Sequence, residues 1–246
     1  MLSGKTAVIT GCLQGIGRST MDMFAENGAN VFACCQSAND DFSRHVEELS
    51  QKYDLRIIPI YFDMLDEAAI KQGVRDIQKS KMNVDVLVNI AGANIDALFH
   101  MVTMEQLRKT FEINFFSQIL FTQYITRLML KQGKGSVINV SSISAIDGNI
   151  GQLSYSASKG AIISATKTMA QELGPKGIRV NAIAPGVIQT AMTAGLPHEA
   201  LTRLLSRSNL DRVGLPSEVA NVIMYLASDM SSFVTGQIIR IDGGIG

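Results

Sequence analysis

Apolar segments rich in β-branched residues alternate with longer amphipathic segments along the whole chain. The apolar segments predict seven strands, at residues 6–10, 30–35, 56–62, 85–91, 136–142, 179–186 and 237–242. The intervening segments have helical periodicity, including residues 15–27, 103–131 and 154–173 and a helix that ends near Lys52. Continuous apolar strands separated by helices are typical of a parallel sheet covered on both faces. The pattern predicts an α/β fold with a doubly wound parallel sheet.

The composition agrees with one α/β domain over residues 1–246. The chain has no linker rich in Pro, Gly or Ser, and its formal net charge of zero provides no electrostatic reason to bind nucleic acid or an anionic membrane. No apolar segment reaches the ~18 residues of a membrane span, and the N-terminus has no signal-peptide pattern. We therefore expect a soluble, cytoplasmic protein that binds neither nucleic acid nor membrane.

Cysteines and histidines do not form a metal-binding pattern. Their spacing matches no zinc motif and predicts no metal; the residues are Cys12, Cys34, Cys35, His45, His100 and His198. Cys34 and Cys35 are adjacent in a strand, so their side chains should point to opposite faces of the sheet. We expect reduced, structural thiols.

The first predicted strand is followed by a glycine-rich turn, "TGCLQGIG" (10–17), that opens the first helix. Gly11, Gly15 and Gly17 allow a tight turn and a close approach of the backbone to a ligand. The helix N-terminus then presents free N–H groups to a pyrophosphate. Between a strand and a helix, this pattern predicts a dinucleotide site and not only a connecting turn.

The end of the second strand helps to distinguish NAD from NADP. An acidic residue there would bind the ribose hydroxyl of NAD, but this chain has Cys35 and Gln36. Ser37 has a hydroxyl that can donate to a 2′-phosphate. Gln14, however, stands where an arginine before the second glycine would favour NADP. These residues favour NADP without excluding NAD.

Tyr155 and Lys159 are separated by about one helical turn, so they lie on the same face of a helix that starts near Leu153. Ser142 precedes the tyrosine by thirteen residues, at the carboxyl end of a predicted strand. Ser141 is the neighbouring hydroxyl and is an alternative to Ser142 from the residues alone. A positively charged Lys159 should stabilise the phenolate and lower the pKa of Tyr155. Tyr155 would then serve as the acid in carbonyl reduction and as the base in alcohol oxidation.

These motifs together resemble the short-chain dehydrogenase/reductase family over essentially the whole chain. The matching elements also include "NIAG" (89–92), in which Ile90 replaces the family's second asparagine, as well as "FEINFF" (111–116), "APG" (184–186) and "VTGQIIRIDGG" (234–244). The resemblance implies a Rossmann-type fold, a nicotinamide cofactor and a catalytic tetrad of Asn114, Ser142, Tyr155 and Lys159. In this tetrad Lys159 also binds the nicotinamide ribose, Ser142 binds the substrate oxygen, and Asn114 holds a water that relays protons to Lys159.

The resemblance also implies a set of cofactor contacts. Asp63 would approach the adenine, although it could instead cap the following helix, and Asn89 would lie near the adenosine ribose. The full set comprises Gly11, Gln14, Gly15, Ile16, Gly17, Gln36, Ser37, Asp63, Asn89, Ala91, Gly92, Tyr155, Lys159, Pro185, Gly186, Ile188 and Thr190.

Within the family, "GNIGQLSYSASKGA" (148–161) and "LASDMSSFVTGQ" (226–237) resemble bacterial 3-oxoacyl-acyl-carrier-protein reductases. This implies NADPH-dependent reduction of a 3-oxoacyl thioester and a homotetramer built through the helices at 103–131 and 154–173 and the C-terminal strand. Residues 190–210 fall where the family has a mobile substrate lid. Their apolar residues either cover an acyl chain or face the core; they are Met192, Leu196, Leu201, Leu204 and Leu205.

A reductase that acts on an acidic acyl-carrier protein should have basic docking residues near the mouth of its site. Lys131 and Lys134 flank Gly133, which stands where the family has a docking arginine, and Lys176 stands at the second docking position. The docking patch is therefore only half present.

Two alternatives remain open from the residues. An NAD-linked dehydrogenase of a polyol, sugar, steroid or hydroxy acid would use the same tetrad. A non-catalytic dinucleotide-binding regulator would not need the tetrad, so the complete set of four residues weighs against it.

Overall fold

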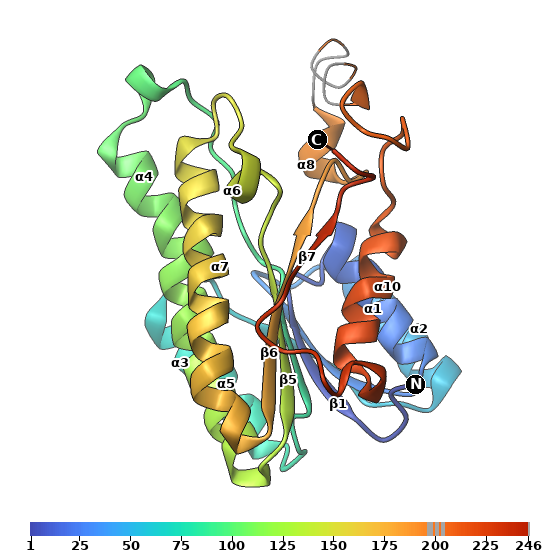
Figure 1. The fold of residues 1–246 in the computed structure, drawn as a ribbon. Helices are drawn as coiled ribbons and strands as arrows, with labels where there is room; N and C mark the ends of the chain where they lie inside the picture. The colour runs from blue at the N-terminus through green and yellow to red at the C-terminus, as the bar shows by residue number, and fades with distance from the viewer. Residues whose placement is uncertain (196–198, 200–201, 203–204, 246) are drawn as a thin grey trace.

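The computed structural model describes residues 1–246 except 196–198, 200–201, 203–204 and 246 (Figure 1). Seven parallel strands form one sheet in the order β3-β2-β1-β4-β5-β6-β7. They are β1 (Thr6–Thr10), β2 (Asn30–Cys35), β3 (Ile57–Tyr61), β4 (Val86–Asn89), β5 (Gly135–Val140), β6 (Ile178–Pro185) and β7 (Ile238–Ile241). The structure confirms all seven predicted strands. The strand order reverses between β1 and β4, which is where ligands bind in doubly wound sheets.

Helices cover both faces of the sheet (Figure 1). One face carries α1 (Gly15–Glu26), α2 (Asp40–Tyr53) and α10 (Pro216–Ala227). The other carries α3 (Glu67–Lys79), α4 (Met104–Phe111), α5 (Ser117–Gln132) and α7 (Leu153–Leu173). The one-turn helix α6 (Ser144–Asp147) follows β5, and the one-turn helix α8 (Ala191–Ala194) follows β6.

The two sheet faces have separate apolar cores because successive strand residues point in opposite directions. Ala7 and Ile9 of β1 pack with α1, α2 and α10, whereas Val8 packs with α3 and α5. Cys34 and Cys35 divide in the same way, as predicted, and burial raises the pKa of both thiols.

The long helix predicted over residues 103–131 is three segments in the structure. A π-helical segment, η2 (Glu112–Phe116), separates α4 from α5. A π-helical turn inserts a residue without changing the apolar periodicity on either side, so the sequence pattern reads as one helix. Asn114 lies at the centre of this segment and is fully buried.

A series of buried polar side chains on the adjacent strands β4 and β5 joins α5 to α7. Asn89 of β4 donates from Nδ2 to Thr122 Oγ1 (2.8 Å) and to Asn139 Oδ1 (2.9 Å). Asn139 of β5 donates in turn to Thr166 Oγ1 (2.9 Å). Thr122 is on α5 and Thr166 is on α7, so these bonds fix both helices against the strands that they cover.

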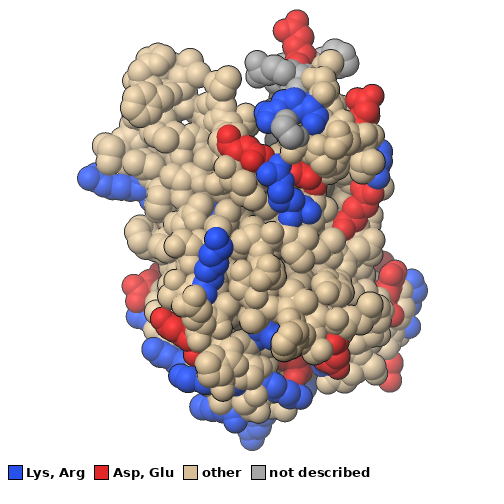
Figure 2. All heavy atoms as spheres, in the orientation of Figure 1, with Lys and Arg blue, Asp and Glu red and all other residues tan. Residues whose placement is uncertain are grey.

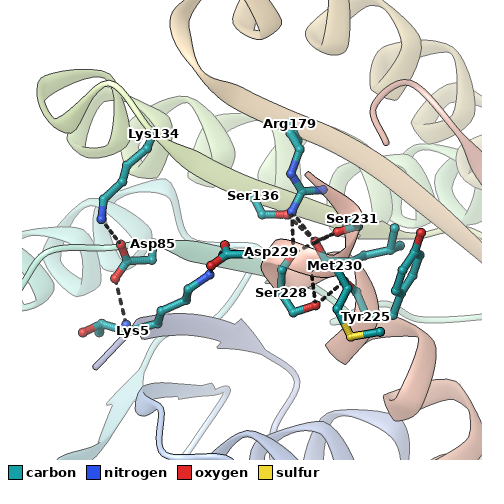
Figure 3. Close-up of polar contacts among 12 residues, drawn as sticks. Lys5, Asp85, Lys134, Ser136, Arg179, Tyr225, Ser228, Asp229, Met230 and Ser231 are labelled. Carbon is teal, nitrogen blue, oxygen red and sulfur yellow. Dashed lines mark hydrogen bonds and ion pairs between the residues drawn. The ribbon is translucent and has the colours of Figure 1, made fainter. Parts of the chain in front are cut away.

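Arg179 binds the C-terminal end of α10, near the amino ends of the strands. Its guanidinium donates to the carbonyl oxygens of Leu226 (2.7 Å), Ser228 (3.3 Å) and Val234 (3.2 Å). Figure 3 shows this group beside the Lys5–Asp229 ion pair (2.6 Å). A cation at the C-terminal end of a helix satisfies carbonyls that have no partner within the helix.

No helix in the described part of the chain combines the length and the apolar character that a membrane crossing requires.

Arg179→Met should lower the free energy of unfolding by roughly 2 kcal/mol, because it leaves buried carbonyl oxygens without their charged donor. Urea denaturation measures this change. Lys5→Gln is the matched control, since Asp229 is largely exposed and the loss should stay below about 1 kcal/mol. Equal losses for the two variants would contradict the assigned role of Arg179.

Candidate active site

A cleft of about 610 Å³ lies at the carboxyl ends of the strands. Its walls come from the segments that follow β1, β2, β3, β4, β5 and β6, together with the start of α7. The lining is mainly apolar. In the described part of the chain, its charged side chains are Asp63, Lys109 and Lys159.

The glycine-rich turn has the geometry that a dinucleotide phosphate requires. Gly11 and Gly15 have φ angles of 76° and 58°, which favour glycine. A Cβ on Gly17 would lie 2.0 Å from the Gly11 carbonyl oxygen, so the helix can approach the strand only with glycine there. The side chain of Gln14, at the N-cap of α1, accepts no capping bond. The first N–H groups of α1 therefore suit an anionic ligand, and the turn fits a pyrophosphate.

Gln36 and Asp63 meet at the end of the cleft beside β2 and β3. Gln36 Nε2 donates to Asp63 Oδ2 (2.9 Å), and the Leu65 amide donates to Asp63 Oδ1 (2.8 Å). These bonds and the nearby Lys109 lower the pKa of Asp63. Asp63 does not cap α3, because Asp66 performs that role through the amides of residues 68 and 69. Asp63 is thus available to the cleft.

Tyr155 and Ser142 face the same space in the cleft. Tyr155 is in the first turn of α7, and Ser142 follows β5. The Ser142 hydroxyl lies close enough to Tyr155 to lower the pKa of the phenol. Ser141 instead donates to the carbonyl oxygen of Lys159 (2.9 Å) and is buried. A substrate oxygen beside Tyr155 can therefore reach the hydroxyl of Ser142.

Lys159 is a buried cation one turn after Tyr155. Its Nζ donates to the Val140 carbonyl oxygen (2.7 Å), and the residue is only 2% exposed. Burial lowers its pKa to about 8. A Cβ on Gly92 would lie 3.3 Å from Nζ and 3.1 Å from Asn114 Oδ1, so the glycine leaves room for both groups.

The expectation that Lys159 lowers the pKa of Tyr155 is wrong. Burial raises the pKa of Tyr155, Ser142 lowers it by hydrogen bonding, and Asp96 raises it through its negative charge. The Lys159 ammonium is 6.0 Å from the centroid of the tyrosine ring and bonds to Val140 instead. Spacing along a helix placed the two residues side by side, but it could not show how deeply each side chain is buried. Burial is the largest cause of both pKa shifts.

Asn114 lies behind the cleft and does not line it. Its Oδ1 accepts from the Ala93 amide (2.8 Å), while its Nδ2 donates to the Ala93 carbonyl oxygen (2.8 Å) and to Ser158 Oγ (3.1 Å). The side chain thus ties η2 to the segment after β4 and to α7.

Most of the predicted cofactor residues line the cleft: Gly11, Gln14, Gly15, Ile16, Gly17, Gln36, Asp63, Ala91, Gly92, Tyr155, Lys159, Pro185, Gly186, Ile188 and Thr190. Two predicted residues do not. Ser37 is exposed outside the cleft, and the side chain of Asn89 is occupied by Thr122 and Asn139. The predicted ribose contact of Asn89 is therefore wrong for its side chain, which points into the space between sheet and helices.

Sequence reasoning missed several lining residues, including Thr10, Leu65, Lys109 and Ile113. Thr10 Oγ1 accepts from the amides of Ile90 (2.9 Å) and Ala91 (3.1 Å), so it fixes the segment after β4. Its position directly before Gly11 was the available signal. Lys109 and Ile113 reach the cleft from α4 and η2, and no local pattern marks them.

The predicted docking residues do not lie near the mouth of the cleft. Lys131 and Lys134 flank the turn between α5 and the start of β5, and Lys176 precedes the start of β6. Figure 2 shows Lys and Arg side chains gathered at this lower end of the molecule, opposite the end where the cleft opens. The expectation of a basic patch at the mouth within one chain is wrong.

The predicted lid is only partly described. The structure places α8 directly after Thr190, which lines the cleft. Leu205 lines a smaller pocket nearby. Leu196, Leu201, Leu204 and the side chain of Met192 lie outside the described residues, so the proposed apolar cover stays a prediction.

Comparisons with known proteins cover almost the whole chain. A family model described as Enoyl-(Acyl carrier protein) reductase matches residues 11–246. The chain is 44% identical to the 3-oxoacyl-(acyl-carrier-protein) reductase FabG of Thermotoga maritima, over 99% of this chain and 98% of that protein. It is 36% identical to a 3alpha-hydroxysteroid dehydrogenase of Mediterraneibacter gnavus, over 99% and 98%.

A solved structure has the same fold. It is a putative NAD(P)-dependent gluconate 5-dehydrogenase from Beutenbergia cavernae with bound NADP, and the match has a TM-score of 0.93 at 30% identity. It covers 99% of this chain and 97% of that one.

Removal of the buried charge in Lys159→Met should change how stability depends on pH. The folded pKa of about 8 lies below the ordinary value of 10.5, so keeping Lys159 charged costs the folded state about 3 kcal/mol at neutral pH. This cost decreases as pH rises from about 8 toward 10.5. Urea denaturation of cofactor-free protein should therefore show that wild type gains about 2 kcal/mol relative to Lys159→Met between pH 7 and pH 9.5. A constant difference would contradict the lowered pKa.

Proposed function

The chain belongs to the short-chain dehydrogenase/reductase family of NAD(P)-dependent oxidoreductases, and we propose that it reduces 3-oxoacyl thioesters to 3-hydroxyacyl thioesters with NADPH. The observation that carries the proposal is the pair of hydroxyls, Tyr155 and Ser142, that face one point in the cleft beside a buried lysine. Two donors aimed at one oxygen suit a carbonyl that becomes an alkoxide.

In this proposal, Tyr155 donates its proton to the substrate oxygen while Ser142 hydrogen-bonds to it. When bound, the reduced nicotinamide supplies the hydride. The raised pKa of Tyr155 keeps the phenol protonated at neutral pH, which is the form that a general acid needs. Lys159 has a pKa of about 8 and lies one turn after Tyr155 on α7, so it can hold the proton that restores the phenol, and it would also bind the nicotinamide ribose. Asn114 supports this path by holding η2 and α7 together.

The residues along the cleft would hold the cofactor in order. The glycine-rich turn would bind the pyrophosphate, Asp63 would approach the adenine, and the segment from Ala91 to Gly92 would lie along the ribose side. Residues 186–190 would contact the nicotinamide carboxamide. We propose these contacts from the lining of the cleft and from the family resemblance.

NADP is supported over NAD by the uncharged residue that follows β2 and by one cation on the same side of the cleft. The residue after β2 is Gln36 and not a carboxylate, and its amide is held by Asp63 at 2.9 Å. Lys109 is the cation on this side of the cleft and can attract a 2′-phosphate. The bound NADP in the structure from Beutenbergia cavernae supports the same choice.

An acyl thioester is supported by the surface around the cleft mouth. Ile150 and Phe99 are 75% and 80% exposed. The Ala97 amide donates to the Gly151 carbonyl oxygen (2.8 Å), so the loops that carry these two side chains are adjacent. Exposed apolar side chains in loops that adjoin the start of α7 suit an acyl chain better than a sugar or a polyol.

Delivery by an acyl-carrier protein requires a second copy of the chain. Lys131, Lys134 and Lys176 lie at the end of the sheet opposite the cleft, so a carrier bound there would be on the wrong side of its own subunit. If two copies associate through α5 and α7 in opposite directions, the basic end of one lies near the cleft of the other. The tetramer implied by the family resemblance would provide this arrangement.

Purified protein should oxidise NADPH when acetoacetyl-CoA is added, at a rate at least about tenfold higher than with NADH. Absorbance at the nicotinamide band measures both rates. Crotonyl-CoA is the control for carbon–carbon double-bond reduction, which the description of the family model raises, and it should not be reduced. Turnover of crotonyl-CoA alone, or of gluconate and steroids alone, would show that a 3-oxoacyl thioester is not the substrate.

Tyr155→Phe should lower kcat by about 10²- to 10⁴-fold, because the substrate oxygen loses its proton donor. Cofactor binding, followed by NADPH fluorescence, should change less than twofold. Tyr53→Phe is the matched control, since Tyr53 hydrogen-bonds to Glu26 on the surface away from the cleft. Full activity in Tyr155→Phe would exclude the assigned role.

A further inference from the structure

One side chain, Arg240 of β7, joins segments that surround the active site. Its Nη1 and Nη2 donate to Asp147 Oδ1 (3.0 Å) and Oδ2 (2.7 Å), and its Nε donates to Asp242 Oδ2 (2.7 Å). Nη2 also donates to the Ile245 carbonyl oxygen (2.7 Å). All three guanidinium nitrogens are engaged, and a planar fork on a carboxylate holds its partner in one orientation.

Asp147 connects Arg240 to the loop that carries Ser142. This aspartate is the last residue of α6, the one-turn helix that begins two residues after the serine. The Ser144 amide donates to Ser142 Oγ (3.2 Å), and the Ala145 amide donates to the Ser142 carbonyl oxygen (3.1 Å). A displacement of α6 would therefore move the hydroxyl that faces Tyr155.

Asp242 connects Arg240 to the cofactor side of the cleft. Its side chain is 7% exposed. Gly186, which lines the cleft at the end of β6, has no space for a side chain because a Cβ there would lie 2.8 Å from the Cα of Asp242. The Gly186 amide also donates to the Ile241 carbonyl oxygen (2.9 Å). The position of Asp242 thus determines how closely the C-terminal segment packs against the end of β6 that lines the cleft.

Ile245 and the turn before it connect Arg240 to the segment after the predicted lid. The Gly243 carbonyl oxygen accepts from the Leu210 amide (3.2 Å) and from Ser208 Oγ (3.1 Å). Ile245 is 6% exposed and lines a pocket with Leu205 and Leu210. The C-terminal turn therefore lies between Arg240 and residues 208–210.

We propose that Arg240 is a positioning residue for the reaction, which acts through Asp147 to hold the Ser142 loop in register with the cofactor side of the cleft. This inference rests on the proposed function, because it concerns the approach of Ser142 and Tyr155 to a substrate oxygen. Small displacements of such groups are costly: a shift of about 1 Å can lower a rate by up to about 100-fold. Arg240 does not line the cleft, and the backbone bond from Gly186 to Ile241 does not depend on its side chain, so its effect should appear in kcat and not in cofactor affinity.

The experiment compares Asp147→Ala, Arg240→Gln and the double variant with wild type. Acetoacetyl-CoA reduction at saturating NADPH, well below the unfolding temperature of each variant, measures kcat and KM. Each single variant should lower kcat about tenfold with a change of less than twofold in the NADPH dissociation constant. The double variant should be no worse than the more damaged single variant, because both substitutions break the same contact.

Lys5→Gln is the matched control. It removes an ion pair of 2.6 Å at the other end of the sheet (Figure 3) and should leave kcat and KM unchanged. A full kcat in Asp147→Ala and Arg240→Gln, or losses that multiply in the double variant, would overturn the inference. If wild type itself does not reduce acetoacetyl-CoA while it binds NADPH, the proposed substrate fails instead, and the comparison is repeated with the substrate that wild type turns over.

Discussion

The active site depends on one buried charge, the ammonium group of Lys159. Placing a cation among apolar residues is expensive, and here the bond from Nζ to the Val140 carbonyl oxygen offsets only part of the cost. The rest of the structure must hold α7 close to β5 for this bond to form. The lowered pKa near 8 is the direct result, and it brings Lys159 into the range where it can exchange protons under physiological conditions.

Buried polar bonds provide the rigidity that this charge requires. The side chains of Asn89 and Asn139 link the two central strands to α5 and α7, and Asn114 links η2 to Ala93 and Ser158. Apolar packing alone would allow the helices to slide, since it has no directional preference, whereas hydrogen bonds specify one register. Asn89, which the family resemblance assigned to the cofactor, serves this internal alignment.

The two ends of the sheet have different roles: stabilising contacts lie at the amino ends of the strands, and the cleft lies at their carboxyl ends. At the amino ends of the strands, Arg179 closes α10 and Lys5 pairs with Asp229. At the carboxyl ends, the glycine-rich turn, Ser142 and Tyr155 leave a cleft, and Arg240 links the loops on its two sides. Loops beyond the carboxyl ends carry function because a rigid sheet positions them without constraining their sequence.

The sequence by itself determined the strands, most helices, the glycine-rich turn and the adjacency of Tyr155 to Lys159. All of these are marked by local patterns of periodicity, composition and spacing along the chain. Only the tertiary structure decided the direction of the Tyr155 pKa, the inward orientation of Asn89, the π-helical turn at Asn114 and the place of Lys131, Lys134 and Lys176. Those features depend on burial and on partners from distant segments, as the bond between Arg240 and Asp147 does, and no local pattern encodes which distant residues will meet.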